Sequence, residues 1–202
     1  ELIFDGLISF KDTLKTTARE TLARAKDLNV AVKIITGDSR EVAGAVGYAV
    51  GLIAHPEEVV IGKELDEMSE AERREAVSKG MVFARISPRQ KYDIIKTLQE
   101  EYEVGFLGEG INDAPALKLA NVAIVVESAS DIAREAADVV LLQKSLGTVI
   151  DGIKEGRTIF ANILKYLKVT LTSNFGNFYS VALASLFLPF VPLLPIQILL
   201  LN

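Results

Sequence analysis

An acidic, glycine-rich run at residues 108–113 has the composition of a site for phosphate and a hard metal ion. The run reads GEGIND, and its candidate residues are Gly108, Glu109, Gly110, Asn112 and Asp113. Glycine lets the backbone approach a ligand closely, and magnesium prefers oxygen ligands such as carboxylates. A plain acidic turn is the alternative interpretation of the same residues.

Two further segments contain the other groups that a phosphoryl site needs. Thr36, Gly37 and Asp38 form a Thr-Gly-Asp turn with a hydroxyl donor, and Lys91 offers an ammonium group that could neutralise phosphate charge. Each segment also has an ordinary structural interpretation. Asp38 or Ser39 could cap the next helix, and Lys91 alone could be a surface lysine. The three segments together, in this order, favour a phosphoryl site.

Short apolar runs that alternate with amphipathic stretches predict the architecture that would position these segments. The runs are continuously apolar, as buried parallel strands are, and they lie at residues 30–35, 81–84, 104–107, 122–126 and 139–142. Helical stripes lie between them, at Leu14, Ala18, Leu22, Ala25 and Leu28 and at Val42, Val46 and Val50. The pattern predicts an α/β, Rossmann-like domain with a parallel sheet flanked by helices.

The order of strands and motifs predicts that the candidate residues meet at one edge of this sheet. In open α/β sheets, ligands bind beyond the carboxyl ends of the strands. The Thr36 turn follows the run at 30–35, and the Gly108 run follows the one at 104–107. Between them, the acidic segment 53–80 contains Ser69 and Glu72, a capping box that predicts a surface helix.

The distribution of charge changes near the carboxyl end. Every Lys, Arg, Asp and Glu lies at or before Lys168, so residues 169–202 carry no formal charge. A membrane span needs roughly 20 apolar residues, and this segment therefore predicts a transmembrane helical hairpin in a lipid bilayer; a buried core helix is the alternative. Cations just before it favour a multi-pass cell-membrane protein with residues 1–168 in the cytoplasm. They are Lys154, Arg157, Lys165 and Lys168.

Composition also excludes some classes of partner and site. The net charge of −5, without a basic stripe, argues against a nucleic-acid partner. The absence of cysteine excludes disulfides and thiolate metal sites. In the uncharged segment, Asn174 and Asn177 share a helical face, and Asn202 lies on the next predicted span. Such residues either serve transport or form hydrogen bonds between helices, and the sequence leaves both roles open.

Four motifs resemble the phosphorylation domain of P-type cation-transporting ATPases, within the haloacid-dehalogenase superfamily. They are ITGD (35–38), ARISPRQK (84–91), GEGINDAPALKLANVAIVV (108–126) and SASDIAREAADVVLL (128–142). The resemblance covers essentially the whole chain, and residues 155–202 are most similar to the bacterial magnesium-transporting branch. It implies a phosphorylation domain at 1–146, a stalk helix at 147–172, a fifth membrane helix at 173–188, and a loop with the start of the sixth at 189–202.

The resemblance implies a pump that ATP phosphorylates on an aspartate, with Mg²⁺ as cofactor and a divalent cation, expected to be magnesium, as cargo. The implied catalytic residues are Thr36, Gly37, Asp38, Lys91, Asn112 and Asp113. Thr36, Gly37, Lys91, Gly108 and Gly110 would bind the phosphoryl group. Glu109 and Asp113 would hold the catalytic magnesium. Asn174, Asn177 and Asn202 would bind the transported cation.

The chain departs from the family pattern in three places. The Asp-Lys-Thr-Gly-Thr motif with the phosphorylated aspartate is not among the 202 residues, so we expect a carboxyl-side fragment, inactive alone, whose partners are the remaining pump domains. DTLK (12–15) replaces an Asp-Pro-Pro-Arg-like turn. Glu109 stands where the family has aspartate, and its extra methylene moves the oxygens by about 1.5 Å. This predicts slower phosphoryl transfer or an altered metal preference.

Two other classes of function compete with the pump. One is a non-catalytic, membrane-anchored remnant or regulatory fragment that lacks the nucleophile; coding sequence upstream of Glu1 with a phosphorylatable aspartate would exclude it. The other is a soluble phosphatase of the same superfamily, which predicts no bilayer segment.

Overall fold

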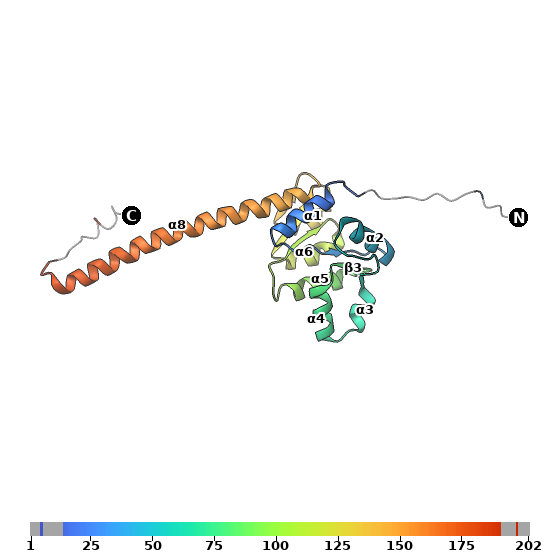
Figure 1. The fold of residues 1–202 in the computed structure, drawn as a ribbon, viewed down its shortest axis with the longest axis horizontal. Helices are drawn as coiled ribbons and strands as arrows, with labels where there is room; N and C mark the ends of the chain where they lie inside the picture. The colour runs from blue at the N-terminus through green and yellow to red at the C-terminus, as the bar shows by residue number, and fades with distance from the viewer. Residues whose placement is uncertain (1–4, 6–13, 191–196, 198–202) are drawn as a thin grey trace. The chain divides into compact units, whose positions relative to one another are not determined.

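The computed structural model describes residue 5, residues 14–190 and residue 197. The chain divides into two compact units, Glu1–Ile150 (unit 1) and Asp151–Asn202 (unit 2). Figure 1 shows their elements along the chain. All strands of the described residues belong to unit 1. The segments that the sequence places after strands are therefore all in this unit.

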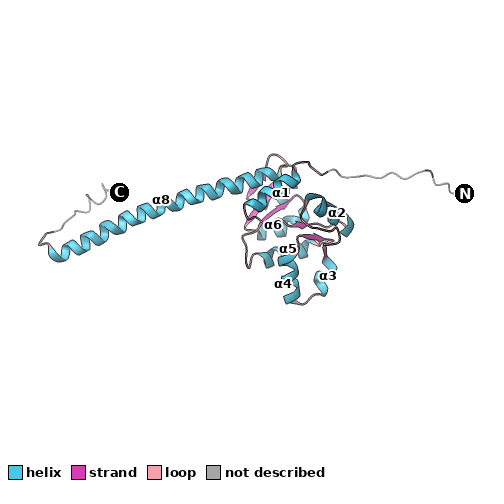
Figure 2. Cartoon of the chain, in the orientation of Figure 1, coloured by secondary structure: helices cyan, strands magenta, loops and turns pink. Residues whose placement is uncertain are grey.

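Unit 1 contains two three-stranded parallel sheets (Figure 2). The first has the order β1-β3-β2, with β1 at Ile34–Ile35, β3 at Val82–Ala84 and β2 at Val60–Ile61. The second has the order β4-β5-β6, with β4 at Gly105–Gly108, β5 at Val122–Val126 and β6 at Val139–Leu141. Thr36 and Glu109 directly follow β1 and β4, so each lies at the carboxyl edge of its own sheet.

The parallel α/β class is confirmed, but details of the strands differ from the prediction. The run at 30–35 is a strand only at Ile34–Ile35, because its first residue closes the preceding helix through a hydrogen bond from Val30 N to Ala25 O (2.9 Å). β2 lies in the acidic segment 53–80, where only a helix was expected. The described β1 and β4 do not pair with each other, so the sheet is in two halves.

Helices flank both sheets. Those of unit 1 are α1 (Ala18–Asp27), α2 (Arg40–Val50), α3 (Gly62–Glu67), α4 (Glu70–Lys79), α5 (Pro88–Leu98), α6 (Ala114–Leu119) and α7 (Asp131–Glu135), with a 3₁₀ turn, η1, at Ile111–Asp113. The predicted capping box opens α4: Glu72 N donates to Ser69 Oγ (3.4 Å), and Ser69 N donates to Glu72 Oε2 (2.9 Å). The surface helix predicted from this box is therefore confirmed.

α2 packs through small residues rather than through the predicted valine stripe. Its buried residues are Ala43, Gly44, Gly47 and Val50, whereas Val42 is 53% exposed. A Cβ atom on Gly44 would lie 2.0 Å from the carbonyl oxygen of Pro56. The helix approaches its neighbours more closely than a face of valines allows, so of the predicted stripe only Val50 is fully buried.

The central strand of each sheet lies in the hydrophobic core of its half of unit 1. Val82, Phe83 and Ala84 of β3 are fully buried, as is Val125 of β5. α5, which follows β3, packs against α6, which follows β4. This helix pair joins the two halves of unit 1 and fixes the carboxyl edge of one sheet relative to the other.

One helix, α8, runs without interruption from Leu146 to Phe187, over most of the segments expected as the stalk and the fifth membrane helix. It begins in unit 1, where Val149 packs against the core and Ile150 is 2% exposed. Among the residues that the structure describes, no helix is both long and apolar enough to cross a membrane. The transmembrane hairpin stays a prediction, and residues 191–196 and 198–202 of it, including Asn202, lie outside the described residues.

Candidate functional site

A partly buried ion pair connects two of the predicted motifs. Lys91 Nζ lies 2.6 Å from Asp113 Oδ1, and the two side chains are only 16% and 13% exposed. Lys91 is on the first turn of α5, and Asp113 ends η1. Residues separated by 22 positions in the sequence thus share one polar contact between the two halves of the sheet.

Asp113 also organises the glycine-rich run. Its Oδ2 atom accepts hydrogen bonds from the backbone N–H groups of Glu109 (3.2 Å) and Gly110 (3.1 Å). A Cβ atom on Gly108 would lie 2.9 Å from Asp113 Cβ, so the bare backbone at Gly108 is what lets the carboxylate turn back onto the loop. The predicted close approach occurs here, and its partner is the loop's own aspartate.

The surroundings of Asp113 stabilise its charged form. Burial raises the pKa of this carboxyl, but the hydrogen bond and charge of Lys91 and the two backbone N–H groups lower it further, so the net pKa is below its ordinary value of 3.8. Asp113 therefore remains ionised at neutral pH, and Lys91 retains a fixed anionic partner.

The Thr36 turn is a compact side-chain-bonded loop. Thr36 Oγ1 donates to Asp38 Oδ2 (2.9 Å) and accepts from the Asp38 N–H (3.1 Å), a pattern common in Thr and Asp turns. Ser39 caps α2 by accepting from Val42 N, which is one of the two capping roles expected from the sequence. Gly37 is exposed. The hydroxyl of Thr36 is thus bonded within the turn, to Asp38.

Backbone hydrogen bonds tie this turn to the segment that carries Lys91. Ile86 N donates to Thr36 O (3.0 Å), and Arg85 N donates to Asp38 O (2.9 Å). Ser87 then caps α5 in a capping box with Gln90, and Pro88 starts the helix. The turn, the cap, Lys91 and Asp113 form one continuous series of contacts at the carboxyl edges of the two sheets.

Arg85 is a feature that the sequence interpretation missed. Its φ angle is 50°, in the left-handed region that residues other than glycine rarely adopt. In this conformation Arg85 N bonds to Asp38 O, and the missing side chain of Gly62, where a Cβ atom would lie 2.5 Å from Arg85 O, leaves room for it. No local pattern in the sequence indicates this strain, because it arises from contacts between three separate segments.

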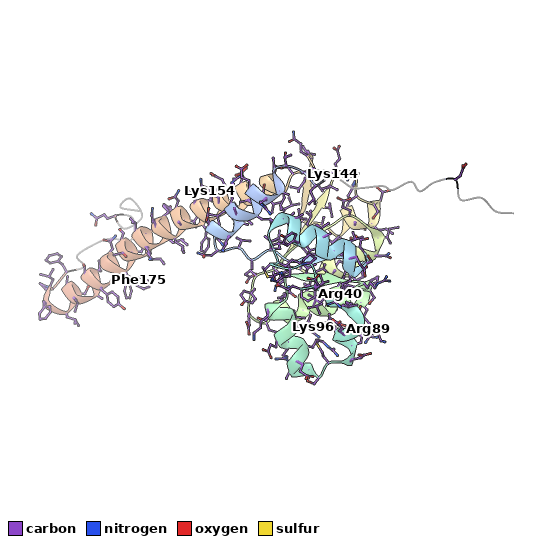
Figure 3. All side chains as sticks on the ribbon, turned by 45° about the vertical axis from the view of Figure 1, so that its right-hand side comes forward. Arg40, Arg89, Lys96, Lys144, Lys154 and Phe175 are labelled. Atoms are coloured by element: carbon purple, nitrogen blue, oxygen red, sulfur yellow. The ribbon has the colours of Figure 1, made fainter. Side chains whose placement is uncertain are left out.

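Lys144 was also missed, although a signal for it exists. Its Nζ atom lies 3.4 Å from Glu109 Oε2, with both side chains more than half exposed. Lys144 comes three residues after β6, so it shares the carboxyl edge of the second sheet with Glu109, which follows β4. The rule that loops after parallel strands converge could have found it. Figure 3 shows Lys144 on the segment that leads into α8, well apart from Lys96 of α5.

Glu109 and Asp113 are hard oxygen donors, but they form no complete metal cage. Within the described residues, no group of three or more His, Cys, Asp or Glu side chains could hold a metal. Magnesium usually takes one or two carboxylates and completes its shell with phosphate and water. Both Asp113 oxygens are already bonded, one to Lys91 and the other to two backbone N–H groups. Glu109 is therefore the carboxylate that can join a magnesium ion shared with a phosphoryl group.

The remaining predicted residues are not part of this cluster. Asn112 is exposed within η1, next to Asp113. Asn174 and Asn177 lie in α8 and belong to unit 2, three residues apart on one helical face. The structure thus brings Lys91, Asp113 and the Glu109 loop into contact and links the Thr36 turn to them through backbone.

Comparisons with known proteins agree with the motifs. A family model described as haloacid dehalogenase-like hydrolase matches residues 3–121. "Magnesium-transporting ATPase, P-type 1" of Escherichia coli (strain K12) is 48% identical over 203 aligned positions, which span all of this chain and 22% of that protein. The protein of the same name in Salmonella typhimurium (strain LT2) is 45% identical, with the same coverage. The chain spans about a fifth of the length of these relatives.

A solved structure shares the fold. The crystal structure of a zinc-transporting PIB-type ATPase in the E2.Pi state superimposes with a TM-score of 0.67 and 26% identity. The match covers 87% of this chain and 24% of the other.

Proposed function

Because this chain belongs to the haloacid dehalogenase-like hydrolase family, we propose that it is part of a P-type ATPase that couples ATP hydrolysis to cation transport across a membrane. The observation that carries the proposal is the series of contacts from the Thr36 turn to Lys91 and Asp113, in a chain whose magnesium-transporting relatives are 45–48% identical over its full length. ATP would phosphorylate an aspartate of a segment outside these 202 residues, and the resulting aspartyl phosphate would later be hydrolysed.

In this proposal, residues of unit 1 bind and stabilise the phosphoryl group. The Thr36 hydroxyl and the N–H of Gly37 donate to phosphoryl oxygens, and Lys91 neutralises their charge while Asp113 holds the ammonium in place. Phosphoryl transfer is promoted almost entirely by such positioning and charge stabilisation. A magnesium ion, when bound by Glu109 with Asp113 beside it, would supply further charge neutralisation. Asn112, exposed beside Asp113, would provide a side-chain amide to the same site.

Transport would involve unit 2. We propose that Asn174 and Asn177 of α8, with Asn202, provide amide oxygens for the transported cation, and that this cation is magnesium. Amide and carbonyl oxygens suit hard cations. Replacing Asn177 with Ala in the full-length protein should raise the magnesium concentration for half-maximal ATPase activity by about tenfold, whereas an unchanged value would remove Asn177 from the cation path.

The ion pair provides the sharpest test of the catalytic proposal. In the full-length protein, Lys91→Met should lower the ATPase rate by about 100-fold, because it removes a charge aimed at the phosphoryl group. Lys96→Met is the matched control: it lies on the same helix, is exposed, and should leave the rate within a factor of two. If Lys91→Met retained most of the ATPase activity, the proposal that Lys91 stabilises the phosphoryl group would be wrong.

A further inference from the structure

We propose that Lys144 is a positioning residue that holds the Glu109 carboxylate at the carboxyl edge of the second sheet, and that a divalent cation bound by Glu109 must displace it. The inference rests on the proposed function, and it concerns the same site. It assigns a role to a lysine that none of the motifs contains, and it explains what the extra methylene of Glu109 does.

The topology places Lys144 within reach of Glu109. β4, β5 and β6 are adjacent and parallel, so the ends of β4 and β6 lie on the same edge with β5 between them. Neighbouring strands are about 4.8 Å apart, and the gap across β5 is thus about 10 Å. A lysine and a glutamate can span this gap together, and their charged atoms lie 3.4 Å apart.

The backbone at both ends of the pair is held in place. Lys15 Nζ donates to Lys144 O, which fixes the segment between β6 and α8. Ser130 N donates to Glu109 O (3.0 Å), which fixes the Glu109 loop from the other side. Because the backbones are fixed, the length of the acidic side chain decides whether the two charges meet.

An aspartate at position 109 would hold its carboxylate further from Lys144. Removing one methylene would withdraw the carboxylate by about 1.5 Å, and with the Lys144 side chain as it lies, the 3.4 Å contact would be lost. With glutamate at position 109, the carboxylate is therefore paired with Lys144 before any cation binds. A divalent cation and the Lys144 ammonium then compete for the same oxygens.

The competition should be modest because the pair is exposed. The Lys144 and Glu109 side chains are 56% and 57% exposed, and exposed pairs are weak. Removing the Lys144 charge should therefore tighten divalent-cation binding at Glu109 by about two- to fivefold.

The test is a titration of the 202-residue chain with Mn²⁺, followed by electron paramagnetic resonance, and it needs no ATP. Lys144→Gln should lower the Mn²⁺ midpoint by about two- to fivefold, and Lys96→Gln, which removes the same charge elsewhere on unit 1, should leave it unchanged. In the Glu109→Gln background, Lys144→Gln should have no effect. In the Glu109→Asp background its effect should be smaller, because the shorter acid lies further from Lys144.

Three results would overturn the proposal: an unchanged midpoint in Lys144→Gln, an equal shift in the Glu109→Gln background, or the absence of any Mn²⁺ component that depends on Glu109. The outcome is distinguishable from a failure of the proposed function. If Lys91→Met leaves the pump active while Lys144→Gln shifts the Mn²⁺ midpoint through Glu109, the catalytic proposal fails and the positioning role stands. The opposite pair of results rejects the positioning role alone.

Discussion

The partly buried pair of Lys91 and Asp113 should make the stability of unit 1 depend on pH. Asp113→Asn leaves the partly buried Lys91 charge without its partner, which should cost about 2 kcal/mol of the free energy of unfolding at pH 7. The pKa of Asp113 is lowered in the folded state, so its stabilisation is complete above the ordinary value of 3.8 and is lost as the pH falls through the folded pKa. Urea unfolding at a series of pH values measures this.

The difference between wild type and Asp113→Asn should therefore close below pH 3.8. Glu70→Gln is the control, because Glu70 pairs with Arg74 at the surface, with its side chain 82% exposed, and it should cost no more than about 0.5 kcal/mol at any pH. A constant difference at all pH values would show that Asp113 contributes through neutral hydrogen bonds instead.

At the scale of single residues, the sequence predicted contacts between residues that belong to recognisable motifs. Lys91 and Asp113 were predicted to share one site, and they are in contact. Lys144 and Arg85 were not found. The contact of Lys144 depends on the register of three strands, and the strain at Arg85 depends on Gly62 and Asp38 from two other segments. The strain at Arg85 therefore has no signature in a local pattern, whereas Lys144 could be found only from the order of the strands.

Two glycines in helices should respond oppositely to alanine. Gly44→Ala in α2 should destabilise unit 1 by roughly 2 kcal/mol, because the new methyl would overlap the backbone of Pro56. Gly156→Ala in α8 meets no atom within 4 Å and should stabilise its helix by about 0.5–1 kcal/mol. Thermal unfolding followed by circular dichroism compares the two variants. A stable Gly44→Ala variant would mean that α2 can move away from the Pro56 loop.

The cap of α5 should matter for both stability and activity. Ser87→Ala removes the side chain that accepts from Gln90 N and should cost about 1 kcal/mol. Ser69→Ala removes the equivalent cap of α4 and should cost about the same. Only Ser87→Ala should also slow the full-length ATPase, because α5 carries Lys91. Equal ATPase rates in the two variants, measured well below their unfolding temperatures, would show that the cap of α5 does not affect the position of Lys91.

At the scale of elements, length decided what could be predicted. Runs of four or five apolar residues gave β3, β4, β5 and β6 close to their observed positions. β2 has two residues and lies in an acidic segment, so its periodicity cannot be read from the sequence. The buried face of α2 was misassigned because glycine and alanine, which carry no strong hydropathy signal, form the closest contacts.

At the scale of the whole molecule, the boundary between the units lies inside a continuous helix. α8 begins at Leu146, and the units divide after Ile150. The resemblance implied a helix from residue 147, but the sequence could not show how many of its first residues belong to the core. That number follows from packing: Val149 lies against the second sheet's cluster, and Ile150 is buried.

The first turn of α8 should therefore be required for the stability of unit 1. A chain that ends at residue 155 keeps Val149 and Ile150, and it should unfold at the same urea concentration as a chain that ends at residue 168. A chain that ends at residue 145 loses both side chains and should be less stable by roughly 3 kcal/mol. Ile150→Ala in the 202-residue chain separates packing from fraying at a new end, and it should cost about 2–4 kcal/mol by itself. If truncation at 145 and at 155 gave equal midpoints, α8 would be independent of the core from its first residue.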